Sequence, residues 1–106
     1  MGEYQKLAQA YMIYPESQKV NYPILGLTSE AGEVADKYKK IIRDKGGKMT
    51  DEDRTEMLRE VGDVLWYLAA ICTDLDMPLH QAALMNIQKL GSRLERNVIQ
   101  GSGDHR

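Results

Sequence analysis

Residues 27–40, LTSEAGEVADKYKK, and residues 59–68, REVGDVLWYL, decide the fold, because each segment sets two acids three residues apart beside an apolar stripe. The acids are Glu30, Glu33, Glu60 and Asp63. Successive helical residues rotate by about 100°, so residues three apart lie on the same side of a helix. On each helix, the pair of acids lies along the same edge of the apolar stripe. If the two helices pack antiparallel, the four carboxylates can converge along the shared seam.

The apolar periodicity on either side of these segments is helical throughout, with no alternating strand pattern. It predicts helices at about residues 4–14, 22–43, 51–74 and 78–96. The chain is therefore expected to be all-α, with an antiparallel four-helix bundle-like core. We expect a single domain over residues 1–96 and a flexible tail over residues 97–106.

Capping residues support these boundaries. Asn21 is a candidate cap for the second helix, and Pro23 fits its first turn, where a missing N–H costs nothing. Gly46 supplies a stop for that helix. Thr50 with Asp53 has the spacing of a capping box at the start of the third helix.

The third helix also carries apolar residues opposite its main stripe. Trp66 and Ala70 lie on that second side, so the helix should be covered on both faces. A subunit interface would explain this pattern, and we expect oligomerisation to complete the core. A nucleobase stacked on Trp66 is a second interpretation.

Composition excludes several classes of function. The 106 residues are 42% hydrophobic with a net charge of −2, which gives no general electrostatic case for nucleic acid binding. Cys72 is the only cysteine, which excludes an intrachain disulfide and favours a reducing interior. No uncharged run is long enough to span a membrane, and no signal-like segment opens the chain. The sequence therefore predicts a cytoplasmic protein without a membrane partner.

The paired acids indicate a metal site. Four convergent carboxylates raise one another's pKa unless a cation compensates them. Oxygen ligands without histidine or cysteine favour Mg²⁺, with Mn²⁺ as the alternative, and Mg²⁺ commonly takes substrate phosphate oxygens as further ligands. The competing interpretation is a solvated helix face, in which Glu33 pairs with Lys37 one turn away.

Other polar residues could complete such a site. Tyr67 follows Asp63 by one turn, and Lys37 opens a basic segment that could close over a polyphosphate. On the fourth helix, three polar residues at spacings of three and four could reach phosphate or only solvate the outer face: Asn86, Lys89 and Arg93.

Two other classes of protein also place acids on helices. A di-iron bundle uses acids on facing helices but expects Glu-x-x-His pairs, and no glutamate here has a histidine three residues on. A non-catalytic helical interaction module would keep the acids as solvated faces and place Trp66 at a partner surface.

The segments SEAGEV (29–34) and EVGDVLWYL (60–68) resemble the E-x-x-E…E-x-x-D signature of MazG-type nucleoside triphosphate pyrophosphohydrolases. YPILGLTSEAGEVADKYKK before them and NIQKLGSR after them are similar to compact, single-domain members. The resemblance covers about residues 4–94. It implies a four-helix core, assembled as a homodimer or homotetramer. It also implies Mg²⁺-dependent hydrolysis of nucleoside triphosphates to monophosphate and pyrophosphate, with a preference for deoxynucleotides.

By the same resemblance, the metal ligands would be Glu30, Glu33, Glu60 and Asp63. Either Glu30 or Glu33 would act on the attacking water. Substrate contacts would come from Asn86, Lys89 and Arg93. Related sequences often continue from the arginine into Tyr-Pro, whereas this chain reads RLERNV (93–98).

Overall fold

The chain folds as four α-helices and one short 3₁₀ helix in a computed structural model that describes residues 2–96. The elements are α1 (Gly2–Gln9), η1 (Glu16–Gln18), α2 (Asn21–Lys45), α3 (Asp51–Asp74) and α4 (Leu79–Glu95). The prediction of an all-α fold is confirmed, since every regular element of the described residues is helical. The predicted flexible tail, residues 97–106, lies outside the described part of the chain.

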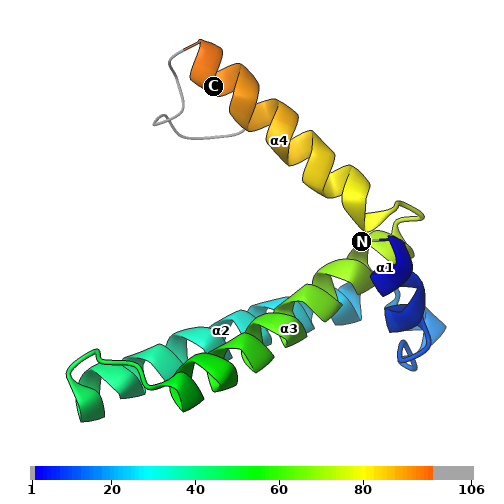
Figure 1. Cartoon of the computed structure of the whole chain (residues 1–106). Coiled ribbons are helices and arrows are strands. Elements are labelled where there is room, and N and C mark those ends of the chain that lie inside the picture. The colour runs from blue at the N-terminus through cyan, green and yellow to red at the C-terminus, as the bar shows by residue number, and fades with distance from the viewer. Residues whose placement is uncertain (1, 97–106) are drawn as a thin grey trace.

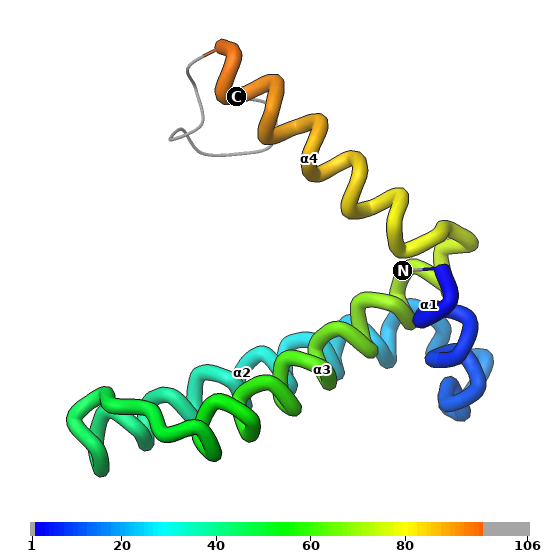
Figure 2. The backbone as a smooth tube through the Cα atoms, viewed as in Figure 1, coloured from blue at the N-terminus to red at the C-terminus, as the bar shows by residue number. Residues whose placement is uncertain are grey.

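The helices α2 and α3 form a long antiparallel pair, to which α1 and α4 attach at one end (Figure 1). The short α1 packs against α3 near the end of that helix, and α4 starts beside this junction. From there α4 diverges from the α2–α3 pair instead of lying along it, as the backbone trace makes clear (Figure 2). The radius of gyration is 16.8 Å, whereas a compact domain of this length would have about 13 Å. A single chain therefore forms an open arrangement of the expected four helices.

The cap predicted at the start of α3 is confirmed. The Thr50 hydroxyl accepts a hydrogen bond from the Asp53 N–H at 3.1 Å, and the Asp53 carboxylate accepts one from the Thr50 N–H at 3.0 Å. At the end of α2, Gly46 adopts the left-handed conformation with φ 60° and ends the helix after Lys45. These two caps fix the turn between the long helices.

The predicted cap of α2 is wrong. Asn21 is the first helical residue, and Val20 takes the cap position without any side-chain hydrogen bond. Val20 has φ 70°, a conformation that a β-branched residue adopts only when its surroundings impose it. Here the Val20 N–H donates to Asp74 Oδ2 at 2.9 Å, which ties the start of α2 to the end of α3. Pro23 lies in the first turn, as predicted, and is fully buried.

The first helix is shorter than its apolar pattern predicts, because α1 ends at Gln9 and not near Tyr14. Residues 10–20 turn back towards the end of α3, where the Tyr14 hydroxyl donates to Asp74 Oδ2 at 2.7 Å. The same carboxylate oxygen therefore holds Tyr14 and Val20. This contact lies about 60 residues away in sequence, so local periodicity could not report it.

The small core lies where α1, α3 and α4 meet. Ala8, Ala69 and Leu79 are buried there, and the Trp66 indole N–H donates to the Ala8 carbonyl at 3.2 Å. Gln5 joins α1 to α4, because its side-chain oxygen accepts from the Leu79 N–H at 2.7 Å. Cover from α1 of the same chain thus accounts for the second apolar face of α3, for which a subunit interface had been expected.

Much apolar surface remains exposed in the single chain. On α2 and α3 it includes Ile24, Leu25, Ile42, Leu58, Val61 and Leu68, and on α4 it includes Leu84, Met85, Ile87, Leu90 and Leu94. Exposed apolar area of this extent is typical of interaction surfaces. None of the helices within residues 2–96 is long and apolar enough to cross a membrane.

Candidate metal centre

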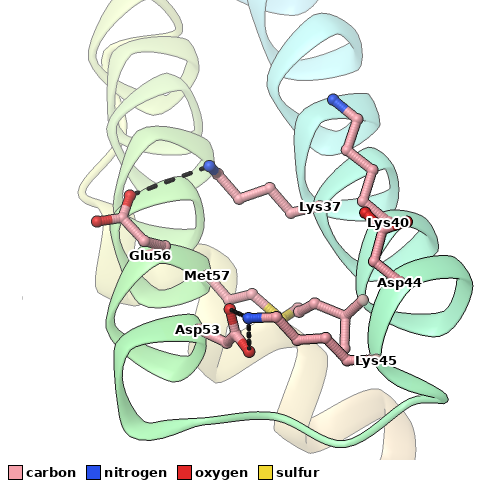
Figure 3. Close-up of a pocket in the computed structure, with 8 residues that line it drawn as sticks. Lys37, Lys40, Asp44, Lys45, Asp53, Glu56 and Met57 are labelled. Atoms are coloured by element: carbon pink, nitrogen blue, oxygen red, sulfur yellow. Dashed lines mark hydrogen bonds and ion pairs between the residues drawn. The ribbon is translucent and has the colours of Figure 1, made fainter.

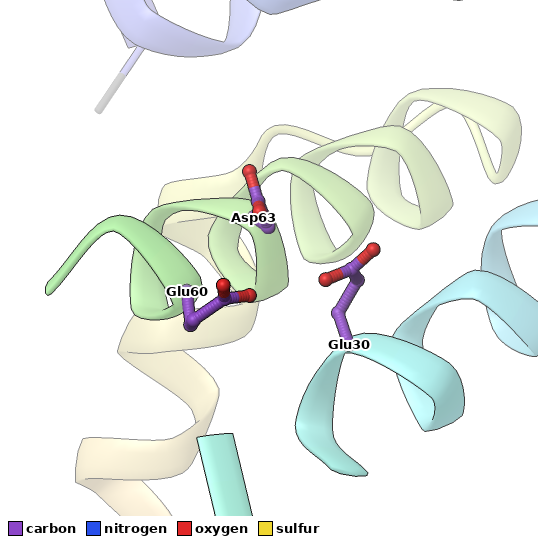
Figure 4. A group of neighbouring side chains, drawn as sticks. All are labelled: Glu30, Glu60 and Asp63. Atoms are coloured by element: carbon purple, nitrogen blue, oxygen red, sulfur yellow. The ribbon is translucent and has the colours of Figure 1, made fainter. Parts of the chain in front are cut away.

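Three of the four predicted acids come together across the α2–α3 pair. Glu30 projects from α2 towards Glu60 and Asp63 on α3 (Figure 4), and one carboxylate oxygen from each lies within 4.8 Å of the others. The antiparallel packing brings Glu30 close to Glu60, although the two residues are thirty positions apart in the sequence and lie on opposite sides of the turn. The sequence prediction of a convergent group is therefore matched by the geometry for these three residues.

The three carboxylates of the group carry more negative charge than the neighbouring Lys37 balances. Burial raises the pKa of Glu30 above its ordinary value, and the negative charges of Asp63, Glu60 and Glu33 raise it further. Asp63 also helps to raise the pKa of Tyr4, which reaches this region from α1 and whose own burial is the larger cause. Proton affinity raised in this way is the electrostatic condition in which a cation would be bound.

Glu33 lies one turn beyond Glu30 on α2 but outside the three-carboxylate group. Its side chain is exposed, and its charge is close enough to contribute to the raised pKa of Glu30. The structure therefore places the fourth acid beside the group, where it can contact water or a bound molecule.

Lys37 reaches across from α2 to α3 and is the cation next to this group. Its ammonium lies 3.8 Å from Glu60 and 4.0 Å from Glu56. These are its ion pairs within residues 2–96, so the predicted pairing with Glu33 on its own helix is not formed. Lys37 sits at the edge of the acidic group, where it can neutralise Glu60 or contact an anion.

Tyr67 lies one turn beyond Asp63 on α3, as predicted, and packs its ring directly on the backbone of α2. A Cβ at Gly26 would overlap that ring, so only glycine leaves it room. Burial raises the pKa of Tyr67, and Tyr22, Glu30 and Asp63 add to the effect, which places this hydroxyl beside the acids. Sequence reasoning missed Gly26, although a glycine inside a helical pattern commonly has a packing reason.

The remaining predicted substrate residues lie on α4, away from the acids of the same chain. Asn86, Lys89 and Arg93 occupy the middle and end of α4, which diverges from the α2–α3 pair (Figure 1). Asn86 is exposed, Lys89 is partly buried and Arg93 is buried. The structure therefore does not bring these three residues to the acidic group within one chain.

A hollow of about 220 Å³ lies between α2 and α3, nearer the turn than the acidic group (Figure 3). Here the charges are mixed and paired: the Lys45 ammonium contacts both Asp53 oxygens at 2.8 Å. Lys40 pairs with Asp36 at 2.9 Å. Such pairing is what solvated helix faces usually show, in contrast to the acidic group.

The donor set fits a hard divalent cation. Glu30, Glu60 and Asp63 supply only carboxylate oxygens, the ligands preferred by Mg²⁺ and Mn²⁺, and they come from two helices whose packing fixes their spacing. Exposed acids can also cluster without a metal, but burial and the neighbouring charges of Asp63 and Glu60 together raise the pKa of Glu30, and a cation bound there would offset both effects.

Comparison with known proteins gives an independent view of the chain. A model of the MazG nucleotide pyrophosphohydrolase domain matches residues 18–98. The Gene 37 protein of Mycobacterium phage L5 is 45% identical over 109 aligned positions, which cover 97% of this chain and 96% of that protein. No solved structure matches.

Proposed function

Because this chain belongs to the MazG nucleotide pyrophosphohydrolase family, we propose that it is a Mg²⁺-dependent nucleoside triphosphate pyrophosphohydrolase. It would convert a nucleoside triphosphate, preferentially a deoxynucleotide, to the monophosphate and pyrophosphate. The observation that carries this proposal is the convergence of Glu30, Glu60 and Asp63 across α2 and α3. These acids belong to the E-x-x-E…E-x-x-D pattern by which the chain resembles the family, whose members are generally metal-dependent.

Glu30, Glu60 and Asp63 would hold the cation, with Mn²⁺ as an alternative to Mg²⁺. When bound, the ion would neutralise phosphate charge and lower the pKa of a water molecule. All other steps fall to the chain itself. Lys37, beside Glu60, would contact a phosphate oxygen, and the hydroxyl of Tyr67 lies on the same side, where it could orient the substrate.

Hydrolysis would proceed by attack of water on the α-phosphorus. The new bond joins the water oxygen to that phosphorus, and the bond to the bridging oxygen of the pyrophosphate breaks. Glu33 would accept the proton of the water, because it is exposed and lies beside the three-carboxylate group without belonging to it. Glu30 is the alternative acceptor, since its carboxylate lies within the group itself.

We further propose that the active form is a homodimer or homotetramer. The exposed apolar residues of α4, such as Ile87 and Leu94, need cover, as do those on α2 and α3. A second copy packed on these faces would also bring its own α4 residues towards the acids. Asn86, Lys89 and Arg93 would then contact the substrate of the neighbouring chain, which their position in one chain does not allow.

The test is a screen of pyrophosphate release across the ribonucleoside and deoxynucleoside triphosphates, with and without Mg²⁺. We expect release of pyrophosphate, not of single phosphate, to require Mg²⁺ and to be fastest with a deoxynucleotide. Unchanged release by Glu33→Gln or Asp63→Asn would show that the chemistry is elsewhere.

The rival function is a non-catalytic helical interaction module, favoured by the amount of exposed apolar surface. Thermal melts separate the two, because a ligand that binds only the folded state raises its stability. Mutual stabilisation by Mg²⁺ and a non-hydrolysable deoxynucleoside triphosphate supports the hydrolase. The module predicts no shift with either.

A further inference from the structure

An aromatic pocket lies next to the acidic group, towards the α1 junction. Its volume is about 290 Å³, close to the lower limit for small-molecule sites, and five of its lining residues are aromatic. They are Tyr11, Tyr14, Tyr22, Trp66 and Tyr67. They come from three separate parts of the chain, so tertiary packing assembles the pocket.

The aromatic rings that line the pocket also pack against one another. Tyr14 and Tyr22 stack on each other, with centroids 4.6 Å apart and an interplanar angle of 16°. Trp66 and Tyr67 meet edge to face, with centroids 5.0 Å apart. Trp66 is further fixed by its hydrogen bond to Ala8. Rigid aromatic walls of this kind suit a flat, polarisable ligand.

Tyr67 belongs both to this pocket and to the surroundings of the acids. It follows Asp63 by four residues, about 6 Å along the axis of α3. Burial raises the pKa of its hydroxyl most, and the charges of Glu30 and Asp63 add to that effect. Along the α2–α3 pair, the order is thus Lys37, the acids, Tyr67 and then the other aromatic rings. A molecule with a charged end and a planar end fits that order.

We propose that the aromatic pocket binds the planar base of the nucleotide, and that Asp74 is a positioning residue for its wall. The proposal rests on the proposed function, since the triphosphate would lie at the acids. Base stacking on aromatic side chains contributes to binding whatever the base, because every base has a π-face.

Asp74 acts through residues 10–20. Its Oδ2 accepts hydrogen bonds from the Tyr14 hydroxyl at 2.7 Å and from the Val20 N–H at 2.9 Å. Val20 is held at φ 70°, directly before the turn that carries Tyr22. One carboxylate oxygen therefore fixes both ends of the segment that places the Tyr14–Tyr22 stack, although Asp74 itself does not line this pocket.

The first test uses Trp66, the only tryptophan, as a fluorescent reporter inside the pocket. The full chain is titrated in Mg²⁺ with α,β-methylene analogues of the four deoxynucleoside triphosphates, and separately with inorganic tripolyphosphate, which lacks a base. We expect the nucleotides to change the emission of Trp66, and tripolyphosphate to bind, by calorimetry, without changing it. An equal emission change with both probes would overturn the proposal.

The second test removes one ring. Tyr22→Leu should weaken nucleotide binding about tenfold, within the range of one stacked base, and leave tripolyphosphate binding unchanged. Tyr38→Leu is the matched control, because Tyr38 lies on the same helix outside the pocket and is 40% exposed against 45% for Tyr22. If a second copy of the chain fills the pocket instead, Tyr22→Leu will alter the oligomeric state by sedimentation without altering nucleotide affinity, and the proposal is wrong.

The third test addresses Asp74. Asp74→Ala should raise KM for the nucleotide severalfold with little change in kcat, and Asp74→Asn, which keeps an acceptor oxygen, should restore most of the loss. A purely structural role would lower kcat through loss of folded enzyme and leave KM unchanged. If Glu60→Gln leaves the binding of both probes unchanged, the proposed function itself fails. If only the response to Tyr22→Leu is missing, the pocket assignment alone fails.

Discussion

Two regions of the α2–α3 pair, one beside the turn and one near the middle of the helices, use the same residue types to opposite effect. Near the turn, Lys45 and Thr50 donate to Asp53, and these contacts lower the pKa of that carboxyl to about 2. Farther along, burial and neighbouring acids raise the pKa of Glu30. Figure 3 shows Lys45 joined to Asp53 and Lys37 joined to Glu56, whereas Figure 4 shows Glu30, Glu60 and Asp63 gathered across the two helices. Charge compensation, not the number of acids, separates a structural ion pair from a candidate site.

The largest expected effect comes from neutralising one acid of the candidate site. Glu60→Gln should lower Mg²⁺-dependent pyrophosphate release by more than about 100-fold, beyond the usual cost of losing a residue that only supports a metal ligand. Asp44→Asn removes an acid beside the turn, where the Asp44 carboxylate pairs with Arg43 at 2.7 Å. Its activity should stay within about a factor of two of wild type. Similar losses of activity in both variants would contradict the assignment of the acidic group, and not of the paired acids beside the turn, as the catalytic site.

The packing between the helices can be tested with two glycines of α2. Gly26→Ala places a methyl group against the Tyr67 ring and should lower the free energy of unfolding by about 1–3 kcal/mol. Gly32→Ala meets no atom within 4 Å and should raise it by about 0.5–1 kcal/mol through helix propensity. Urea denaturation measures both. Equal effects would mean that Tyr67 does not pack on α2 at Gly26.

The cation beside the acids offers a smaller effect. Lys37→Met removes the positive charge 3.8 Å from Glu60, so Mg²⁺ should bind about fivefold more tightly, which corresponds to the roughly 1 kcal/mol of a partly exposed pair. Lys39→Met, on the same helix, removes a charge that pairs with Asp36 and should leave Mg²⁺ affinity unchanged. Calorimetric titration distinguishes them, and weaker Mg²⁺ binding by Lys37→Met would contradict the assigned position of this lysine.

The smallest effect concerns the acid stability of the turn. The folded pKa of Asp53 is lowered to about 2, below the value of 3.8 for the free side chain. Its contribution to stability is therefore present above about pH 4 and is lost as the pH falls towards about 2. Asp53→Asn should show a shallower loss of thermal stability than wild type across that interval. Glu52→Gln, in the same helical turn but outside the capping box, should keep the wild-type profile.

The sequence predicted the parts of the molecule that depend on local pattern. Helical spacing gave the four helices, and Thr50 with Asp53 gave the start of α3. The same periodicity placed Glu30 opposite Glu60 and Asp63, because two apolar stripes pack in only a few ways. Glu33 lies outside the group although it has the same three-residue spacing from Glu30 that Asp63 has from Glu60, so spacing alone did not decide the membership.

The features that the sequence did not predict depend on distant contacts. Asp74 holds Tyr14, beyond the end of α1, and the N–H of Val20, whose conformation runs against the preference of a β-branched residue. The direction of α4 follows from the junction with α1, where Gln5 binds the first residue of that helix. Neither partner can be identified from spacing along the chain.

The most direct test of the candidate metal centre is a Mn²⁺ titration followed by electron paramagnetic resonance, since Mn²⁺ favours the same oxygen ligands as Mg²⁺. We predict saturable loss of the free Mn²⁺ signal with wild type and with Asp44→Asn, competition by Mg²⁺, and no comparable binding with Glu30→Gln or Asp63→Asn. Equal Mn²⁺ binding by wild type, Glu30→Gln and Asp63→Asn would contradict the assignment of this acidic group as the metal centre.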